Sequence, residues 1–172
     1  MNDHARRAAG PTRTLWLLAA ALCALGAADG AAAKETKLKS EVIAAENINP
    51  SRRGTPQPVK LHIFYLTAED KFMQVNFADL VAPESPLLGD ELVRRAEHLV
   101  GPGEQLALDE QFDEAAKFIG VIAEFTEIEQ AAWRAVAAVP ARRWTDVLRL
   151  FKNSKLHILV DGTTVTCAIV ED

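Results

Sequence analysis

Short runs of β-branched and aromatic residues, each bounded by turn residues, recur through the chain between Glu41 and Val170. Among the clearest are Val59–Leu66, which alternates apolar and polar residues, and Lys117–Phe125, which is almost continuously apolar. Turn signals about 8–12 residues apart are the pattern of a β-sandwich, and a continuous apolar run is typical of a central strand buried on both faces. We therefore predict an all-β fold with about seven or eight strands.

The C-terminal part of the chain gives the strongest local signal. Two strand-like runs, Lys155–Val160 and Thr163–Val170, flank the dipeptide Asp161-Gly162. Such a dipeptide between two strands is typical of a type I′ hairpin turn, because both central residues of that turn need a positive φ. We predict that Asp161 and Gly162 are those central residues.

Two segments fit a strand less well than the rest. Asp70–Leu80 has Phe72 and Val75 near helical spacing, and Asp70 could cap its start, so this segment predicts a short helix. The composition of Asp90–Val100 is compatible with a helix or a strand, and both remain open at this stage. We expect these apolar residues to be buried: Phe64, Val121, Ile122 and Trp133.

The N-terminus carries an export signal. Three arginines up to Arg13 precede the apolar run Leu15–Ala28, and the small residues Gly30–Ala33 follow. This order is that of a bacterial secretory signal peptide, and the apolar run is shorter than the ~18–20 residues that a membrane-spanning helix needs. We predict a signal peptide and anchor region over residues 1–33, followed by a single domain over residues 34–172.

Cys23 lies within that apolar run, where a bacterial lipoprotein carries its acylated cysteine. The residue before it is Leu22, whereas lipoprotein signals generally have a small residue there. Ordinary cleavage after Ala28 or Ala33 is the alternative, so the protein is either lipid-anchored or free in the periplasm. The other cysteine, Cys167, lies in a strand-like run and is expected to be a buried, unreactive thiol.

Composition and motif searches exclude several functional classes. The net charge of −5 argues against a nucleic-acid-binding protein, and two cysteines are too few for a disulfide framework or a four-cysteine zinc site. The histidines have no metal-binding spacing, and the serines occur in no nucleophile motif. We read His62 and His157 as solvent-facing or hydrogen-bonded strand residues. No catalytic residue, metal site or cofactor is predicted, and the protein is expected not to be an enzyme.

The segment Asn47–Pro58 differs from the other connections. It is long, contains three prolines and carries the adjacent cations Arg52 and Arg53 on an otherwise acidic protein. A stiff, charged loop on a sandwich loses little entropy when it binds, which is typical of a recognition loop. A plain connection between two strands remains the alternative.

A series of short motifs follows in order along the chain: Asn47-x-Asn49-Pro50, Gly54, Pro56-x-Pro58-Val59, Ile63-x-Tyr65-Leu66, Phe72, Phe77-x-x-Leu80, Leu88-Gly89, Pro102-Gly103-Glu104, Ile119-Gly120-Val121-x-Ala123-x-Phe125 and Trp133-Arg134. In this order, behind an export signal, they resemble the outer-membrane lipoproteins of type VI secretion systems, the TssJ (SciN or VasD) family. The resemblance covers roughly residues 40–140.

The resemblance implies a transthyretin-like β-sandwich of two four-stranded sheets with a short additional helix. It also implies a non-enzymatic role under the outer membrane. There the domain would bind the periplasmic part of the inner-membrane protein TssM, which forms a membrane complex with TssL. The family's partner-binding loop corresponds here to nine residues: Asn49, Pro50, Ser51, Arg52, Arg53, Gly54, Thr55, Pro56 and Gln57. A periplasmic carrier of a small ligand is the alternative function.

Overall fold

The computed structural model describes residues 36–37, 39–83, 85–108, 111–113, 115–140 and 154–171. The signal segment with Cys23 and the segment 141–153 lie outside the described residues. The strands are β1 (Thr36–Lys37), β2 (Lys39–Ala44), β3 (Val59–Leu66), β4 (Leu92–Val100), β5 (Gln105–Leu108), β6 (Gln111–Phe112), β7 (Phe118–Ala123), β8 (Arg134–Ala138), β9 (Ser154–Asp161) and β10 (Thr164–Glu171). The helical turns are α1 (Asp70–Gln74), α2 (Phe77–Val81), η1 (Gly89–Glu91) and η2 (Ile128–Gln130).

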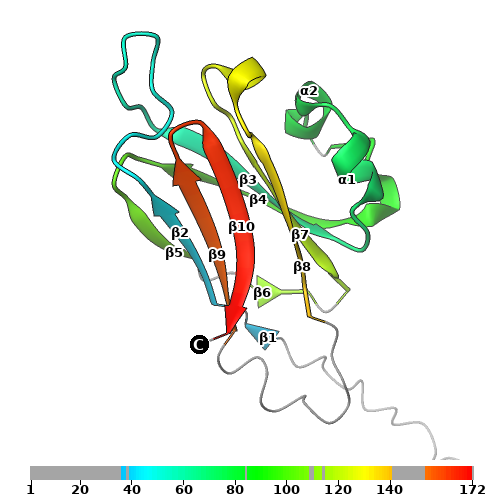
Figure 1. Ribbon diagram of the computed structural model, residues 1–172. Coiled ribbons are helices and arrows are strands. Elements are labelled where there is room, and N and C mark those ends of the chain that lie inside the picture. Colours follow the sequence, from blue (N-terminus) through cyan, green and yellow to red (C-terminus); the bar gives the residue numbers. More distant parts are fainter. Residues whose placement is uncertain are drawn as a thin grey trace, which may run out of the picture. The chain divides into compact units, whose positions relative to one another are not determined.

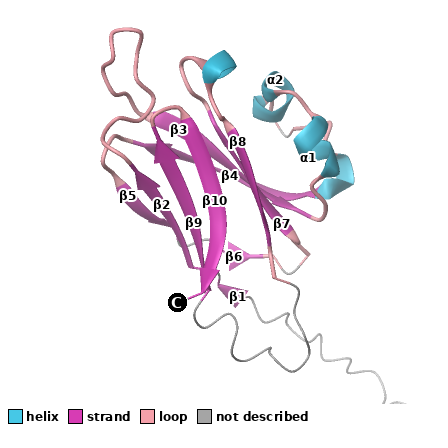
Figure 2. Ribbon diagram, viewed as in Figure 1, coloured by secondary structure: helices cyan, strands magenta, loops and turns pink. Residues whose placement is uncertain are grey.

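Eight of these strands form two four-stranded sheets that face each other (Figures 1 and 2). The first sheet has the order β10-β9-β2-β5, in which β2 and β9 are parallel and the other pairs antiparallel. The second sheet has the order β4-β3-β7-β8 and is antiparallel throughout. The short strands β1 and β6 pair separately. The predicted all-β sandwich of two four-stranded sheets is confirmed.

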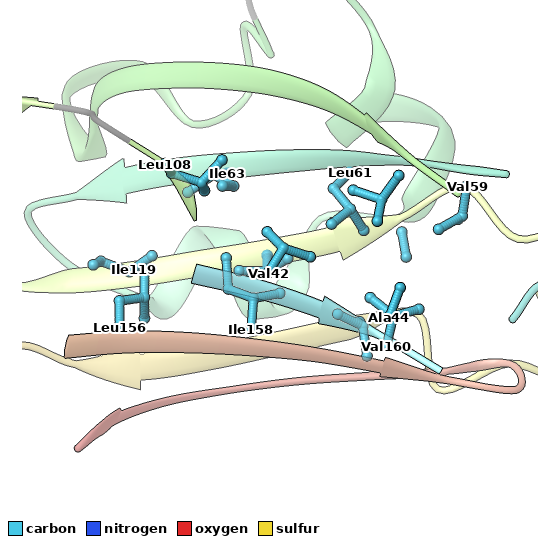
Figure 3. Close-up of a cluster of buried hydrophobic side chains, with 14 of the residues drawn as sticks. Val42, Ala44, Val59, Leu61, Ile63, Leu108, Ile119, Leu156, Ile158 and Val160 are labelled. Carbon is cyan, nitrogen blue, oxygen red and sulfur yellow. The ribbon is translucent and has the colours of Figure 1, made fainter. Parts of the chain in front are cut away.

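Aliphatic side chains from both sheets fill the space between them (Figure 3). Val42 and Ile158 point inward from the first sheet, while Leu61, Ile63 and Ile119 point inward from the second, and all five are fully buried. Strand β2 alternates buried residues with more exposed ones because only one face of the first sheet is covered. This alternation fixes the pairing register of the strand, because a shift by one residue would turn its apolar side chains to the exposed face.

The second sheet is buried on both faces, because α1 and α2 cover its outer face (Figure 1). The residues of this second cluster are Phe64, Leu66, Phe72, Leu80, Leu88 and Ile122. Strands β3 and β7 therefore show nearly continuous burial, and the predicted central strand is confirmed in β7. The predicted helix is present as two short helices separated by Val75 and Asn76, of which Asn76, rather than Asp70, provides a side-chain cap.

Gly120 of β7 allows α1 to approach the sheet closely. A Cβ atom at this position would lie only 2.5 Å from Cζ of Phe72, whose ring lies directly over the glycine. A glycine within a strand often marks such a close approach of another element. The side chain of Phe72 is fully buried there and packs against Phe64 with a ring-centroid separation of 5.3 Å.

The predicted turn of the C-terminal hairpin needs correction. The C-terminal hairpin forms, but Asp161 pairs with Thr164, so its central residues are Gly162 and Thr163. Gly162 has φ +56°, which fits the first central position of a type II′ turn. Val160 and Val165 are paired and both point into the core. Their burial determines this register, since a shift by one residue would expose them.

The ambiguous segment after Asp90 begins with η1 and continues as the edge strand β4, whose pairing with β3 decides for the strand. Of the four residues expected in the core, Phe64, Val121 and Ile122 are fully buried, whereas Trp133 is only half-buried. Trp133 lies at the margin of the helices, where its ring makes an edge-to-face contact with Phe77 at 5.2 Å. Among the described residues, no helix has the length and apolar character needed to cross a membrane.

Candidate functional site: the β2–β3 loop

The β2–β3 loop, residues 45–58, projects from one end of the sandwich (Figure 1). The turn between β9 and β10 and the connection between β7 and β8 reach the same end, whereas β1 lies at the other end (Figure 1). Loop residues Arg52 to Pro58 are exposed, while Ile48 and Asn49 near the start of the loop are buried. The loop therefore has a fixed base and an accessible tip.

Asn49 holds the base of the loop. Its backbone amide donates to the carbonyl of Gly162 at 2.7 Å, its Nδ2 donates to the carbonyl of Pro58 at 2.8 Å, and its Oδ1 accepts from the amide of Thr126 at 2.7 Å. Asn49 has φ +45°, a left-handed conformation that asparagine tolerates better than most residues. The side chain of Asn49 thus connects the start of the loop to its last residue before β3 and to the β7–β8 connection, while its backbone amide connects it to the C-terminal hairpin.

The tip of the loop is a small hydrogen-bonded turn. The amide of Gly54 donates to the carbonyl of Ser51 at 2.7 Å, and the amide of Ser51 donates to the carbonyl of Thr55 at 2.8 Å. The hydroxyl of Ser51 also accepts from the amide of Thr55 at 3.2 Å. Gly54 has φ +78°, so the glycine is required by the turn. The tip presents Arg52 and Arg53 in a defined backbone conformation.

The two arginines at the tip differ in their surroundings. Nε of Arg52 donates to Oε1 of Glu127 at 2.8 Å, and this hydrogen bond raises the pKa of Arg52 above its usual value. The side chain of Arg52 is nevertheless 87% exposed. Arg53 is exposed and forms no hydrogen bond or ion pair with any residue that the structure describes. Arg53 is therefore the uncompensated cation of the loop.

Thr126 and Glu127 were not singled out from the sequence. They lie 77 and 75 residues from the loop residues that they contact, Asn49 and Arg52. No local motif marks them, because only the pairing of β3 with β7 brings the two connections together. Their contacts are the part of this site that required the tertiary structure.

A second polar cluster lies on the outer face of the second sheet, around His62. This side chain is fully buried, so the solvent-facing interpretation of His62 is wrong and the hydrogen-bonded one is right. Nη2 of Arg95 donates to Nδ1 of His62 at 2.6 Å, and Nε2 of His62 donates to Glu124. Since a guanidinium can only donate, Nδ1 is the unprotonated nitrogen. Burial lowers the pKa of His62 below its usual value, so the ring is neutral at pH 7.

Beside this cluster is an open groove of about 560 Å³, lined by Lys60, Val81, Pro83, Arg95 and Glu97. Its charged side chains are already paired: Lys60 lies 2.9 Å from Glu97, and Arg95 donates to Glu97 at 2.8 Å. A small-molecule site is usually an apolar cavity with a few convergent polar groups. This groove differs from that description and does not favour the carrier function.

The described residues contain no group of three or more His, Cys, Asp or Glu side chains that could hold a metal ion. Cys167 is a half-buried strand thiol whose Sγ lies 3.8 Å from the carbonyl of Ile119. Burial raises the pKa of this thiol to about 12, so it is not a reactive thiolate at neutral pH. The expectation of an unreactive thiol agrees with this environment.

The family-model comparison and the comparison with solved structures point to the same family. The T6SS-SciN family model, described as type VI secretion lipoprotein (VasD, EvfM, TssJ), matches residues 36–163. The crystal structure of the T6SS lipoprotein TssJ1 from Pseudomonas aeruginosa is 28% identical, with a TM-score of 0.68 over 80% of this chain and 97% of that one. A search of curated proteins found no match.

Two further solved structures are similar. A chain of the structure titled Type VI membrane complex is 27% identical, with a TM-score of 0.64 over 77% of this chain and 97% of that one. A chain of the structure titled T6SS protein TssM C-terminal domain, from EAEC, is 26% identical, with a TM-score of 0.60 over 76% and 98%. These matches cover the sandwich described above.

Proposed function

The chain belongs to the type VI secretion lipoprotein family of VasD, EvfM and TssJ, and from that membership we propose that it binds the periplasmic part of the inner-membrane protein TssM through its β2–β3 loop. The protein is a structural component of a type VI secretion system. The similar structures whose titles name a type VI membrane complex and the TssM C-terminal domain support this choice of partner. In this proposal TssM joins the protein to TssL, and no catalytic step is involved.

The single observation that carries the proposal is the geometry of the loop. Its base is fixed by Asn49, its tip is an ordered turn, and Arg53 is an exposed cation without a partner among the described residues. A preordered loop loses little conformational entropy on binding, and an unpaired guanidinium is suited to a carboxylate of the partner. We propose that Arg53 meets an acidic residue of TssM.

The position of the loop fits a protein anchored at its N-terminus. Strand β1 and the start of β2 lie at the end of the sandwich opposite the loop (Figure 1). We propose that Cys23 is acylated and holds the protein on the periplasmic side of the outer membrane, or that the protein is periplasmic if cleavage removes Cys23. Because the chain enters the domain at the end opposite the loop, we expect an N-terminal anchor to leave the loop facing away from the outer membrane and toward the inner-membrane partner.

Charge reversal at Arg53 tests the proposal. Truncating one partner of a desolvated charge pair typically costs about 2–5 kcal/mol, and each ~1.4 kcal/mol is a factor of ten in affinity. We therefore expect Arg53→Glu to weaken binding to the periplasmic part of TssM tenfold or more in titration calorimetry. Lys117→Glu, the same charge change at an exposed residue near the opposite end, is the matched control. Unchanged affinity of Arg53→Glu, at low and at physiological salt, would refute this use of the loop.

A further inference from the structure

We infer that Arg52 and Glu127 form a positioning pair, which orients the tip of the β2–β3 loop so that Arg53 faces the partner. This inference rests on the proposed function of the loop. It gives the two adjacent arginines different roles, since Arg52 acts within the protein and Arg53 acts on the partner. It also makes Glu127, a residue of the β7–β8 connection, part of the binding apparatus.

The β7–β8 connection contacts the loop at three residues, two of them at the base and one at the tip. At the base, the amide of Thr126 donates to Oδ1 of Asn49 at 2.7 Å. Also at the base, Oγ1 of Thr126 donates to Oε1 of Gln57 at 3.4 Å. At the tip, Oε1 of Glu127 accepts from Nε of Arg52 at 2.8 Å. Glu127 is therefore the residue of this connection that contacts the tip, whereas Thr126 contacts the base.

The burial of the two partners shows which of them is the fixed one. The side chain of Glu127 is 34% exposed and precedes η2, whereas the side chain of Arg52 is 87% exposed on the projecting tip. An exposed ion pair contributes little to global stability. Its main effect falls on the conformations open to the free loop, and an ordered loop binds more tightly because less freedom is lost on association.

The pair also sets the charge that the tip presents. Glu127 neutralises Arg52, so the positive charge at the tip is concentrated on Arg53. Removing Glu127 leaves two adjacent uncompensated cations on a loop with one fewer contact. If Arg52 contacted the partner directly, such a change would strengthen attraction to a carboxylate. If Arg52 positions the tip, the same change weakens binding.

A charge-swap series on the protein purified after export tests this inference, with the periplasmic part of TssM as the probe. We expect Arg52→Glu and Glu127→Arg each to weaken binding about three- to tenfold, the scale on which ordering of a few side chains affects affinity. The double variant restores the ion pair in reverse, and we expect it to bind within about twofold of the wild type. Arg53→Glu is measured in parallel.

Amide hydrogen exchange in the free protein gives a second measurement, independent of the partner. The amides of Gly54 and Thr55 are bonded to the carbonyl and hydroxyl of Ser51. We expect both amides to exchange faster in each single variant and to return to the wild-type rate in the double variant. Equal exchange rates in all variants would overturn the positioning role, because the ion pair would then not order the tip.

The binding outcomes separate the two proposals. If Arg53→Glu weakens binding and the double variant stays as weak as Arg52→Glu, then Arg52 contacts the partner directly, and the positioning role is refuted while the loop function stands. If Arg53→Glu and the whole charge-swap series bind like the wild type, the loop function itself is refuted, and the inference fails with it.

Discussion

At the scale of single residues, Asn49 determines the course of the β2–β3 loop. Its side chain is both a donor and an acceptor, and its backbone occupies the left-handed region. Few residues combine these properties, since most side chains are strained at positive φ, and glycine has no side chain to form the two bonds. The backbone conformation and the two side-chain bonds therefore explain why asparagine suits position 49, apart from any contact with a partner.

Replacing Asn49 should destabilise the domain. We expect Asn49→Ala to lower the free energy of unfolding by about 2–4 kcal/mol, because it strains the backbone and leaves the carbonyl of Pro58 and the amide of Thr126 without their bonds. Asn49→Gly relieves the strain and should lose only about 1–2 kcal/mol. Urea unfolding of both variants measures the two contributions. Equal losses would show that backbone conformation has no part in the choice of asparagine.

At the scale of elements, two arginines from the edge strands hold the short helices on the second sheet. Nη1 and Nη2 of Arg134 on β8 donate to the carbonyls of Phe72 and Val75 at 2.7 and 2.9 Å. Nη1 of Arg95 on β4 donates to the carbonyls of Leu80 and Ala82 at 3.2 and 2.8 Å. Helices of five residues are not stable alone, so packing and these bonds maintain them.

We expect the attachment of α2 to depend on a neutral His62, because Arg95 contacts both the ring and α2. Its Nδ1 accepts from Arg95, and protonation would turn that nitrogen into a donor facing a guanidinium. The other charged groups around the ring are Lys60 on its own strand, Glu97 on β4 and Glu124 after β7, and Arg134 lies farther along the same row of the sheet. Glu124 favours the protonated ring, but burial is the largest effect and lowers the pKa of His62.

This lowered pKa predicts a pH-dependent stability. Below the ordinary histidine pKa of about 6.5, the unfolded chain binds a proton that the folded protein does not. The free energy of unfolding therefore decreases as the pH is lowered, by at most ~1.4 kcal/mol per pH unit. The contribution is fully present above that value and is lost as the pH falls toward the folded pKa. Urea unfolding from about pH 7.5 down to 5.5 measures the slope.

The control for this measurement is His62→Gln, which keeps a donor and an acceptor but does not titrate. We expect the variant to show a smaller decrease in the free energy of unfolding over the same pH range. If the wild type and His62→Gln lose stability in parallel, another group is responsible and the neutral state of His62 does not control the attachment of α2.

At the scale of the whole molecule, the described domain has its N-terminal strand pair and its loop at opposite ends (Figure 1). The six residues of β2 connect the two ends and span about 20 Å. A domain anchored through its N-terminal segment would therefore hold the loop away from the membrane surface. The division of the chain into a signal and anchor region and a single domain remains a prediction, as does acylation of Cys23.

Acylation of Cys23 can be tested directly. We expect labelled palmitate to enter the protein, and Cys23→Ser to move it from the membrane fraction to the soluble fraction, because several acyl chains anchor a bacterial lipoprotein firmly. Cys167→Ser is the matched control, since this thiol lies within the folded domain. Recovery of a mature N-terminus at Asp29 or Lys34 would rule acylation out and leave the protein free in the periplasm.

Several features followed from the sequence because they depend on local patterns. Alternation in Val59–Leu66 and the continuous apolar run through Phe118–Ala123 predicted strands that the structure confirms. A C-terminal hairpin and a short helix over Asp70–Leu80 were also expected, although the structure divides the helix in two and moves the turn by one residue. The candidate loop was recognised from its prolines and arginines, which are properties of a contiguous segment.

Other features depended on which segments meet, and only the tertiary structure decided them. Asp90–Val100 became a strand because it pairs with β3, and Trp133 stayed half-exposed because it lies at the margin of the helices. The turn at Gly162 shifted by one residue because inward packing set the register. His62 is hydrogen-bonded because β4 and the end of β7 bring Arg95 and Glu124 to it, and Arg52 is paired because the β7–β8 connection supplies Glu127. These contacts join residues far apart in the chain, so no local pattern encodes them.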